Sequence, residues 1–299
     1  MPNSKYKDIA FVIRPTNSDD LSSLIENLCL WLAKREKNIY FLNKEEKRIK
    51  KELAPKAYEE IQFIKEDDLF QKADLIISLG GDGTLIGVSR LSKGKIPIVG
   101  VNKGHLGFIT EFQQSEIFES LDQILNGEFQ PITKPLFHVS VERNKKEIFS
   151  SHFFNDVVFS KNDIARMFTL NISSQNGFIY DITGDGLIVS STVGSTAYSL
   201  AAGGPIVEPE VGAIILTPMH PHSLTHRPIV ISDTSELKVK ISRRDRSVLL
   251  TLDGQEVYEI MDEDEVKIQK STRNVLFIAN PNKNYFRTLR EKFIHPRTG

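Results

Sequence analysis

An apolar strand pattern that runs directly into a glycine-rich turn most restricts how this chain can fold. Residues 74–87 read DLIISLGGDGTLIG. The apolar run is followed by a turn made of Gly80, Gly81, Asp82, Gly83 and Thr84, and a helical pattern begins at once. Glycines at the carboxyl end of a strand let backbone amides approach a phosphate, and the next helix favours an anion at its N-terminus. The segment predicts a strand–turn–helix unit with a phosphate-binding loop.

Asp82 distinguishes this turn from two common phosphate loops. The turn is not the dinucleotide fingerprint, because Ile86 stands where a third glycine is needed, and no Lys-Ser/Thr pair makes it a P-loop. Phosphates repel a neighbouring carboxylate unless it binds a hydroxyl proton or a metal. Asp82 is therefore the candidate catalytic residue of a phosphoryl transfer. The alternative is a structural Asp in an ordinary tight turn.

Short strands alternate with helices over the first part of the chain. Strand patterns occupy 9–13, 39–42, 74–79 and 96–101, and helical patterns follow Ser18 and span 115–125. This order predicts a parallel α/β sheet. The charged stretch 44–52 mixes both signs and is interpreted as a solvated helix face. Asn126-Gly127 ends the last helix, and two prolines then break the chain, which predicts a domain boundary after Lys134.

The rest of the chain consists mostly of strand patterns separated by turn residues, as in LFHVSVER, LKVKIS and VLLTLDG. Residues 285–294 form a short helical pattern that could pack on either domain. The predicted fold is an N-terminal Rossmann-like α/β domain (1–134), a C-terminal β-sandwich-like all-β domain (135–280) and a helical tail (281–299) that packs back.

A second motif, DITGDGLIVSSTVGSTAYSLAAGGPIVEP, starts at Asp181. It predicts a strand preceded by Asp185, then a short helix over 195–202 that stops at Gly203. Ser195 or Thr196 would cap this helix, and their amides and hydroxyls are natural donors to a ligand. A small-residue helix packed on a sheet would explain the alanines but not the clustered Ser and Thr.

Composition excludes several function classes. Lys plus Arg is 38 and Asp plus Glu is 39, so there is no basic field that would attract nucleic acid. No run of about 18 apolar residues predicts a membrane span. Cys29 is the one cysteine and has no disulfide partner within the chain, which indicates a reducing compartment. We therefore expect a cytoplasmic protein.

Two clusters of side chains, one of histidines and one of arginines, are weaker candidates for a binding site. His220, His222 and His226 lie close together, but prolines interrupt them and no nearby Cys or helical carboxylate completes a zinc site. Residues 243–246 carry arginines beside a strand pattern and are interpreted as a solvated basic turn. We expect no metal ion bound by the protein itself.

The order of the motifs resembles that of the NAD kinase family. The shared motifs are, in chain order, GGDGT, NKGHLGFIT at 102–110, Asn155-Asp156, DGLIVS, GSTAYSLAAGG, GAIILTPMHPHSLTHRPIVI and Asp253-Gly254-Gln255. GGDGT alone also occurs in lipid kinases and phosphofructokinases, whereas the whole set is specific. The resemblance covers about 74–255.

The resemblance implies that ATP, arriving with Mg²⁺, phosphorylates the 2′-hydroxyl of the adenosine ribose of NAD, in a cleft between the two domains. Asp82 would accept or orient the hydroxyl proton, with Gly83 beside it. Asn155 and Asp156 would hold the adenosine, and Asp185 the amide or ribose at the other end. The implied pocket also includes Phe108, Thr196, Ala197, Tyr198, Ser199, Leu200 and Ala201, with Arg166, Thr183 and Gln255 at its edge. A homo-oligomer, specifically a tetramer, is implied as well.

This chain departs from the family pattern at two places. The family often has Glu at the position of Asp156, and a Pro-Thr pair in place of Thr192-Val193. The shorter carboxylate has less reach, and the missing Pro leaves a φ angle unfixed. Two alternatives stay open: a lipid or sugar-phosphate kinase with the same loop, and a sensor that binds NAD or NADP without catalysis.

Overall fold

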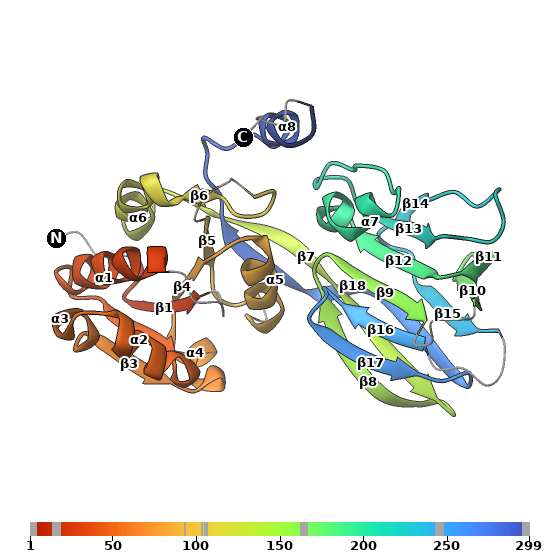
Figure 1. Ribbon diagram of the computed structural model, residues 1–299, viewed down its shortest axis with the longest axis horizontal. Helices are drawn as coiled ribbons and strands as arrows, with labels where there is room; N and C mark the ends of the chain where they lie inside the picture. Colours follow the sequence, from red (N-terminus) through yellow and green to blue (C-terminus); the bar gives the residue numbers. More distant parts are fainter. Residues whose placement is uncertain are drawn as a thin grey trace. The chain divides into compact units, whose positions relative to one another are not determined.

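The computed structural model describes residues 5–13, 19–92, 94–102, 104, 107–161, 167–242 and 248–294. Residues 1–134 together with 274–299 form one compact unit, and residues 135–273 form another. Figure 1 shows helices around a sheet in the first unit and strands over most of the second. The combination of an α/β unit with a β-rich unit confirms the predicted fold class.

The first unit contains a parallel sheet. Its order is β5-β4-β1-β2-β3, with the last residues of β18 beside β5. The bounds are β1 (Asp8–Ile13), β2 (Asn38–Leu42), β3 (Ile61–Ile64), β4 (Leu75–Leu79), β5 (Ile98–Asn102) and β18 (Asp264–Ile278), and the short β6 (Phe112–Gln113) also pairs with β5. Strand β3 has no counterpart among the predicted strands, because it is only four residues long and is bordered by charged residues.

Helices cover this sheet on both faces (Figure 1). Alternate strand residues such as Phe11, Ile77 and Val99 share one core with α1 (Asp19–Ala33) and α6 (Ile117–Leu125). On the other face, α5 (Asp82–Leu91) packs closely through Leu85 against Gly100. The other helices are η1 (Asn43–Glu45), α2 (Glu46–Glu52), α3 (Pro55–Tyr58), α4 (Glu66–Lys72) and η2 (Gln114–Glu116). Helix α6 ends as expected, since Asn126 caps it and Gly127 has a φ of 79°.

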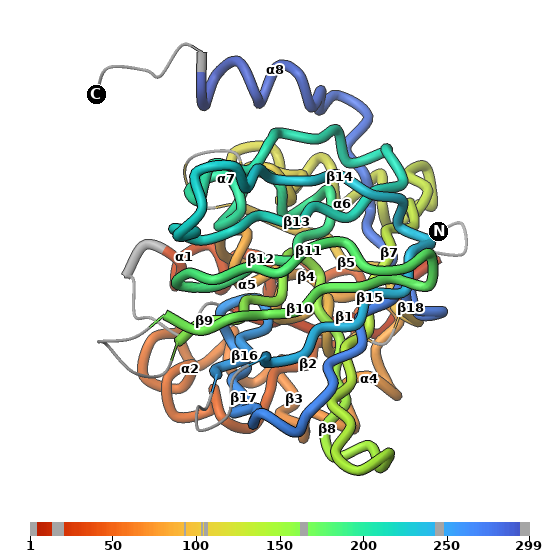
Figure 2. The backbone as a smooth tube through the Cα atoms, turned by 90° about the vertical axis from the view of Figure 1, so that its right-hand side faces the viewer, coloured from red at the N-terminus to blue at the C-terminus, as the bar shows by residue number. Residues whose placement is uncertain are grey.

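The second unit is built from antiparallel strands. One sheet has the order β14-β13-β12-β9-β16-β17, and the other continues from β18 through β15 and β10 to β11, with β7 also paired to β18 and β8 paired to β7. Figure 2 shows β12 and β13 running side by side. Side chains from both sheets form one apolar core, which makes the unit a sandwich. The bounds are β7 (Pro131–Arg143), β8 (Lys146–Phe153), β9 (Asp156–Lys161), β10 (Phe168–Ser174), β11 (Gly177–Gly184), β12 (Gly186–Ser191), β13 (Ala213–Met219), β14 (Ile229–Ser232), β15 (Leu237–Ile241), β16 (Val248–Leu252) and β17 (Glu256–Ile260).

The predicted helix over 195–202 consists of two shorter pieces, η3 (Val193–Thr196) and α7 (Tyr198–Ala201). The predicted caps are wrong. The hydroxyl of Ser195 donates to the carbonyl of Val207, and that of Thr196 donates to the carbonyl of Val193, so neither oxygen accepts from a helix amide. The predicted stop is correct, because Gly203 adopts a φ of 87°.

The tail forms α8 (Tyr285–Leu289) and η4 (Arg290–Ile294) and packs on the first unit. Phe293 stacks on Phe108 at 5.5 Å between ring centroids, and Tyr285 lies 6.2 Å from the same ring. Within the described part of the chain, no helix is both long and apolar enough to span a membrane.

Candidate active site

The glycine turn connects β4 to α5. The amide of Gly80 donates to the carbonyl of Val101, and α5 begins at Asp82 with Gly81 as its N-cap. Among the described residues, a Cβ atom on Gly81 or Gly83 would meet no heavy atom within 4 Å outside the turn and helix themselves, and neither glycine has a positive φ. Neither close packing nor backbone conformation therefore requires glycine at 81 or 83. The space at the Cβ positions of both glycines suits the close approach of a phosphate to this turn.

The carboxylate of Asp82 is held by a single loop. Its Oδ2 accepts a hydrogen bond from the amide of Phe108 (2.9 Å). Its Oδ1 accepts from the amides of Ile109 (3.3 Å) and Thr110 (2.9 Å) and from the Thr110 hydroxyl (3.0 Å). A Cβ on Gly107 would overlap with the same carboxylate, so this loop approaches Asp82 only with glycine there. Successive backbone amides directed at one carboxylate fix its orientation.

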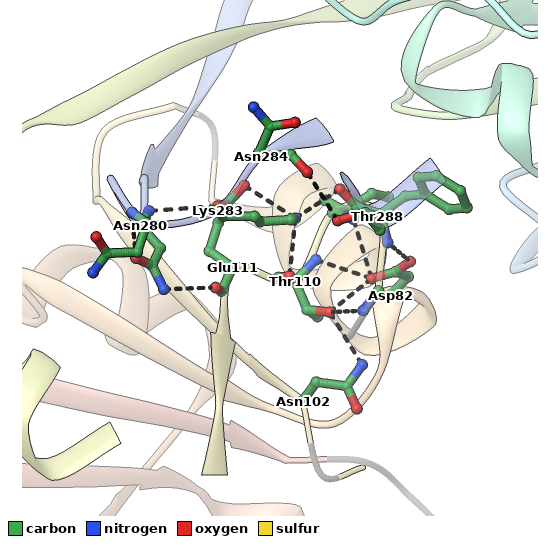
Figure 3. Close-up of polar contacts among 12 residues, drawn as sticks. Asp82, Asn102, Thr110, Glu111, Asn280, Lys283, Asn284 and Thr288 are labelled. Atoms are coloured by element: carbon green, nitrogen blue, oxygen red, sulfur yellow. Dashed lines mark hydrogen bonds and ion pairs between the residues drawn. The ribbon is translucent and has the colours of Figure 1, made fainter. Parts of the chain in front are cut away.

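Thr110 links the carboxylate to the end of β5. Its hydroxyl accepts hydrogen bonds from the side-chain amide of Asn102 (3.1 Å) and from the backbone amide of Gly107 (3.1 Å). Figure 3 shows Thr110 between Asp82 and Asn102. Sequence reasoning missed this role of Thr110, although the residue closes the motif NKGHLGFIT.

A cavity of about 360 Å³ opens in the second unit. It lies among β9, α7, β16 and the turn after β16, and its lining consists of Asn155, Asp156, Val158, Ser160, Ala197, Tyr198, Thr251, Asp253 and Gly254. The side-chain oxygen Oδ1 of Asn155 is buried and has no hydrogen-bond partner among the described residues. Buried polar atoms are normally paired, so this oxygen is an exception in a residue of the cavity wall.

Asp253 shapes this cavity although sequence reasoning gave it no role. Its carboxylate accepts hydrogen bonds from the amides of Phe154 (2.9 Å), Asn155 (2.7 Å) and Asp156 (3.1 Å). Its backbone has a φ of 51°, a left-handed turn that Asp tolerates better than most residues. The Asp-Gly pair at 253 and 254 is a turn signal that was visible in the sequence.

Asp156 lies 5% exposed beside Asp253. Burial, followed by repulsion from the Asp253 carboxylate, raises the pKa of Asp156 to about 7. The side chain is thus divided between its protonated and ionised forms near neutral pH, and it can donate or accept a hydrogen bond at the cavity wall.

Asp185 lies outside the lining of this cavity. Its carboxylate pairs with the ammonium of Lys161 at 2.7 Å and with the imidazole of His220 at 3.4 Å. The nearby hydroxyl of Thr183 shares a hydrogen bond with that of Thr169 (2.8 Å). The buried hydroxyl of Ser199 is likewise paired, with Thr217 at 2.8 Å.

The structure brings together part of the predicted site. Asn155, Asp156, Ala197 and Tyr198 line one cavity, whereas Thr196, Ser199, Leu200, Ala201 and Gln255 do not line it. Phe108 belongs to the loop that holds Asp82, and its ring is covered by tail residues, with the Lys292 ammonium 5.0 Å away. Arg166 and residues 243–246 lie outside the described residues. The described residues contain no group of three or more side chains arranged to hold a metal ion.

A carboxylate in a glycine turn of an α/β unit, and a cavity in a β unit whose wall carries Asn155, Asp156 and Asp253, fit the class of nucleotide-binding phosphotransferases. The family model for the ATP-NAD kinase N-terminal domain matches residues 9–129, and that for the ATP-NAD kinase C-terminal domain matches residues 154–280. The chain belongs to the ATP-NAD kinase family, and it is an enzyme that phosphorylates NAD.

Individual relatives agree with this assignment. An NAD kinase of Geotalea daltonii is 39% identical over 229 residues, which cover 76% of this chain and 81% of that protein. An NAD kinase of Syntrophotalea carbinolica is 42% identical over 220 residues, covering 73% and 77% of the two chains. Yeast NADH kinase in complex with NADH has the same fold, with a TM-score of 0.86 at 22% identity over 100% of this chain and 90% of that chain.

Proposed function

We propose that this chain transfers the γ-phosphoryl group of ATP to the 2′-hydroxyl of the adenosine ribose of NAD, with Asp82 as the general base. In this step the ribose oxygen forms a bond to the γ-phosphorus, and the bond from that phosphorus to the β,γ-bridging oxygen breaks. ADP leaves with the electron pair, and Asp82 takes the hydroxyl proton. The products are NADP and ADP.

The hydrogen bonding of Asp82 is the observation that supports this role most. Donors from the loop 107–110 hold the carboxylate, yet Oδ2 accepts from the amide of Phe108 alone among the described residues. This oxygen retains capacity to accept a hydroxyl proton. A loop that only bound phosphate would function better without a negative charge at this place.

We assign the adenosine part of NAD to Asn155 and Asp156. Both residues line the cavity, and its volume falls within the size range of small-molecule sites. Asp185 is assigned to the amide or ribose at the other end of the dinucleotide, where the ammonium of Lys161 orients its carboxylate. Gly80, Gly81, Gly83 and Thr84 are assigned to phosphate contacts, and the other pocket assignments are Phe108, Arg166, Thr183, Thr196, Ala197, Tyr198, Ser199, Leu200, Ala201 and Gln255.

Four broader assignments accompany the reaction. Mg²⁺ enters as the MgATP complex and neutralises charge on the phosphates. Residues 1–134 supply the phosphoryl-transfer loop and residues 135–280 bind NAD. The buried, unpaired Cys29 agrees with a cytoplasmic location. The assembly is assigned as a homotetramer. This assignment is supported by the edge strands β14 and β17, which expose Val230 (47%) and Val257 (60%). Light scattering that gives a fully active monomer at micromolar concentration would contradict the tetramer.

The reaction is tested by incubating the purified chain with MgATP and NAD and detecting NADP with an NADP-specific dehydrogenase. NADP formation that stops when EDTA removes Mg²⁺ is the expected result. A lipid or sugar-phosphate kinase would instead consume ATP only with those acceptors. A sensor would bind NAD in a calorimeter and form no NADP.

A further inference from the structure

A lysine ammonium lies buried against the loop that holds Asp82. Lys283 stands between β18 and α8, and its side chain is 7% exposed. Its Nζ donates to the carbonyls of Phe108 (2.9 Å) and Thr110 (3.1 Å) and pairs with the carboxylate of Glu111 at 3.4 Å (Figure 3). A buried charge is unfavourable unless it is paired and hydrogen-bonded, and here each partner belongs to residues 108–111.

One peptide group of this loop lies between the two charges. The carbonyl of Phe108 accepts from Lys283, and the amide of Ile109, which belongs to the same peptide group, donates to Asp82 (3.3 Å). The carbonyl and amide of a trans peptide point in opposite directions, and no described peptide bond is cis. The peptide dipole is therefore aligned with both the ammonium and the carboxylate, and each charge strengthens the hydrogen bond at the other end.

The two charges also act on each other directly. Burial lowers the pKa of Lys283, while the negative charges of Glu111 and Asp82 oppose that effect. The lysine is thus coupled to the candidate base by geometry and by charge, although the two side chains make no direct hydrogen bond in the described structure.

The peptide group between Thr110 and Glu111 ties the loop to the sheet. The carbonyl of Thr110 accepts from Lys283, and the amide of Glu111 in the same peptide group donates to the carbonyl of Gly100 in β5 (3.1 Å). Asn280 adds a second connection from the C-terminal segment, since its side-chain amide donates to the carbonyl of Glu111 (3.2 Å). The loop is fixed between β5 and the segment that carries Lys283.

We propose that Lys283 is a positioning residue for phosphoryl transfer, because it fixes the amides that orient the carboxylate of Asp82. The inference rests on the proposed role of Asp82 as the base. Without the ammonium, the carbonyls of Phe108 and Thr110 lose their donor, and the loop can turn its amides away from Asp82. A displacement of about 1 Å at a reacting group can reduce a rate about 100-fold, so turnover is the quantity that responds.

The test compares variants that lack the Lys283–Glu111 ion pair with a control variant that lacks another ion pair. Lys283→Met combined with Glu111→Gln removes both charges of this pair and leaves no unpaired buried ion, and Lys283→Met alone serves as a second variant. The matched control is Lys267→Met combined with Glu142→Gln, which removes an ion pair (2.6 Å) in the second unit. NADP formation, the melting temperature and NAD binding by calorimetry are measured on the same folded preparation at 15 °C.

We expect kcat per folded enzyme to fall about 10- to 100-fold in both Lys283 variants, while the KM values for NAD and ATP change less than about threefold. The control pair should retain kcat within about twofold. A folded Lys283 variant with unchanged kcat overturns the proposal, as does a loss confined to KM. Failure of both Lys283 variants to fold while the control folds would indicate a purely structural role and also overturns it. If the wild-type chain forms no NADP, the proposed function itself fails, and this outcome is distinct from the others.

Discussion

Asp82→Asn tests the candidate base, but the structure shows that this substitution also affects the loop 107–110. The amide group of Asn has one oxygen, which can replace Oδ1 and accept from Ile109 and Thr110. Its NH₂ group would then face the amide of Phe108, which donates to Oδ2 at 2.9 Å in the wild type. Two donors cannot bond each other, so one charge-assisted hydrogen bond is lost.

The loss of that bond should lower stability by about 1.5–3 kcal/mol. For a unit of this size the corresponding fall in melting temperature is about 3–10 °C. Asn also cannot take up a proton near neutral pH, so kcat should fall about 10²- to 10⁴-fold. Scanning calorimetry and NADP formation on one preparation measure both effects.

Thr110→Val distinguishes a catalytic role of Asp82 from a purely structural one. This variant keeps the carboxylate of Asp82 but removes the hydroxyl that accepts from Asn102 and Gly107 and donates to Asp82. The free energy of unfolding should fall by about 1–3 kcal/mol, similar to the loss in Asp82→Asn, while kcat should fall less than about tenfold. Equal losses of kcat in the two variants would refute the reasoning, because Asp82 would then act only as an anchor for the loop.

Two further predictions concern the carboxylates of the second unit. Between pH 3.8 and about 7 the folded chain binds more protons at Asp156 than the unfolded chain, so its free energy of unfolding should fall as pH rises through that window and level off above it. Asp156→Asn should remove this decline, at most about 3 kcal/mol in urea titrations from pH 5 to 8, and an unchanged slope would exclude Asp156 as its source. Asp185→Asn should raise the KM for NAD more than that for ATP, and equal effects on both would argue against an NAD contact.

Local sequence patterns predicted much of the fold. The strands of the parallel sheet have continuous apolar runs, and the end of α6 at Gly127 follows from one residue that readily adopts a positive φ. Strand β3 was missed, because a four-residue strand between charged residues shows no period. The caps at 195 and 196 were wrong, since the Ser195 hydroxyl bonds to the carbonyl of Val207, which a local pattern does not reveal, and the Thr196 hydroxyl bonds back to the carbonyl of Val193.

The sequence predicted the candidate site only where the interacting residues are close together in the chain. Asp82 stands out because its glycine neighbours are adjacent in sequence. Lys283 could not be found in the same way, because it contacts a loop more than 170 residues away. No periodicity or turn signal distinguishes it from the exposed lysines around it.

The carboxylates of Asp82 and Asp253 are held by the same hydrogen-bonding arrangement, each in a separate unit. Each carboxylate accepts hydrogen bonds from three successive backbone amides, those of residues 108–110 and 154–156 respectively. Such a cluster stabilises a negative charge and converts a flexible segment into one defined conformation. Burial raises the pKa of Asp156, and the charge of Asp253 adds to that increase, so the carboxylate that anchors this loop also affects its neighbour. A carboxylate can therefore be an anchor and a reacting group at once, and only variants that separate the two roles reveal what Asp82 contributes to the reaction.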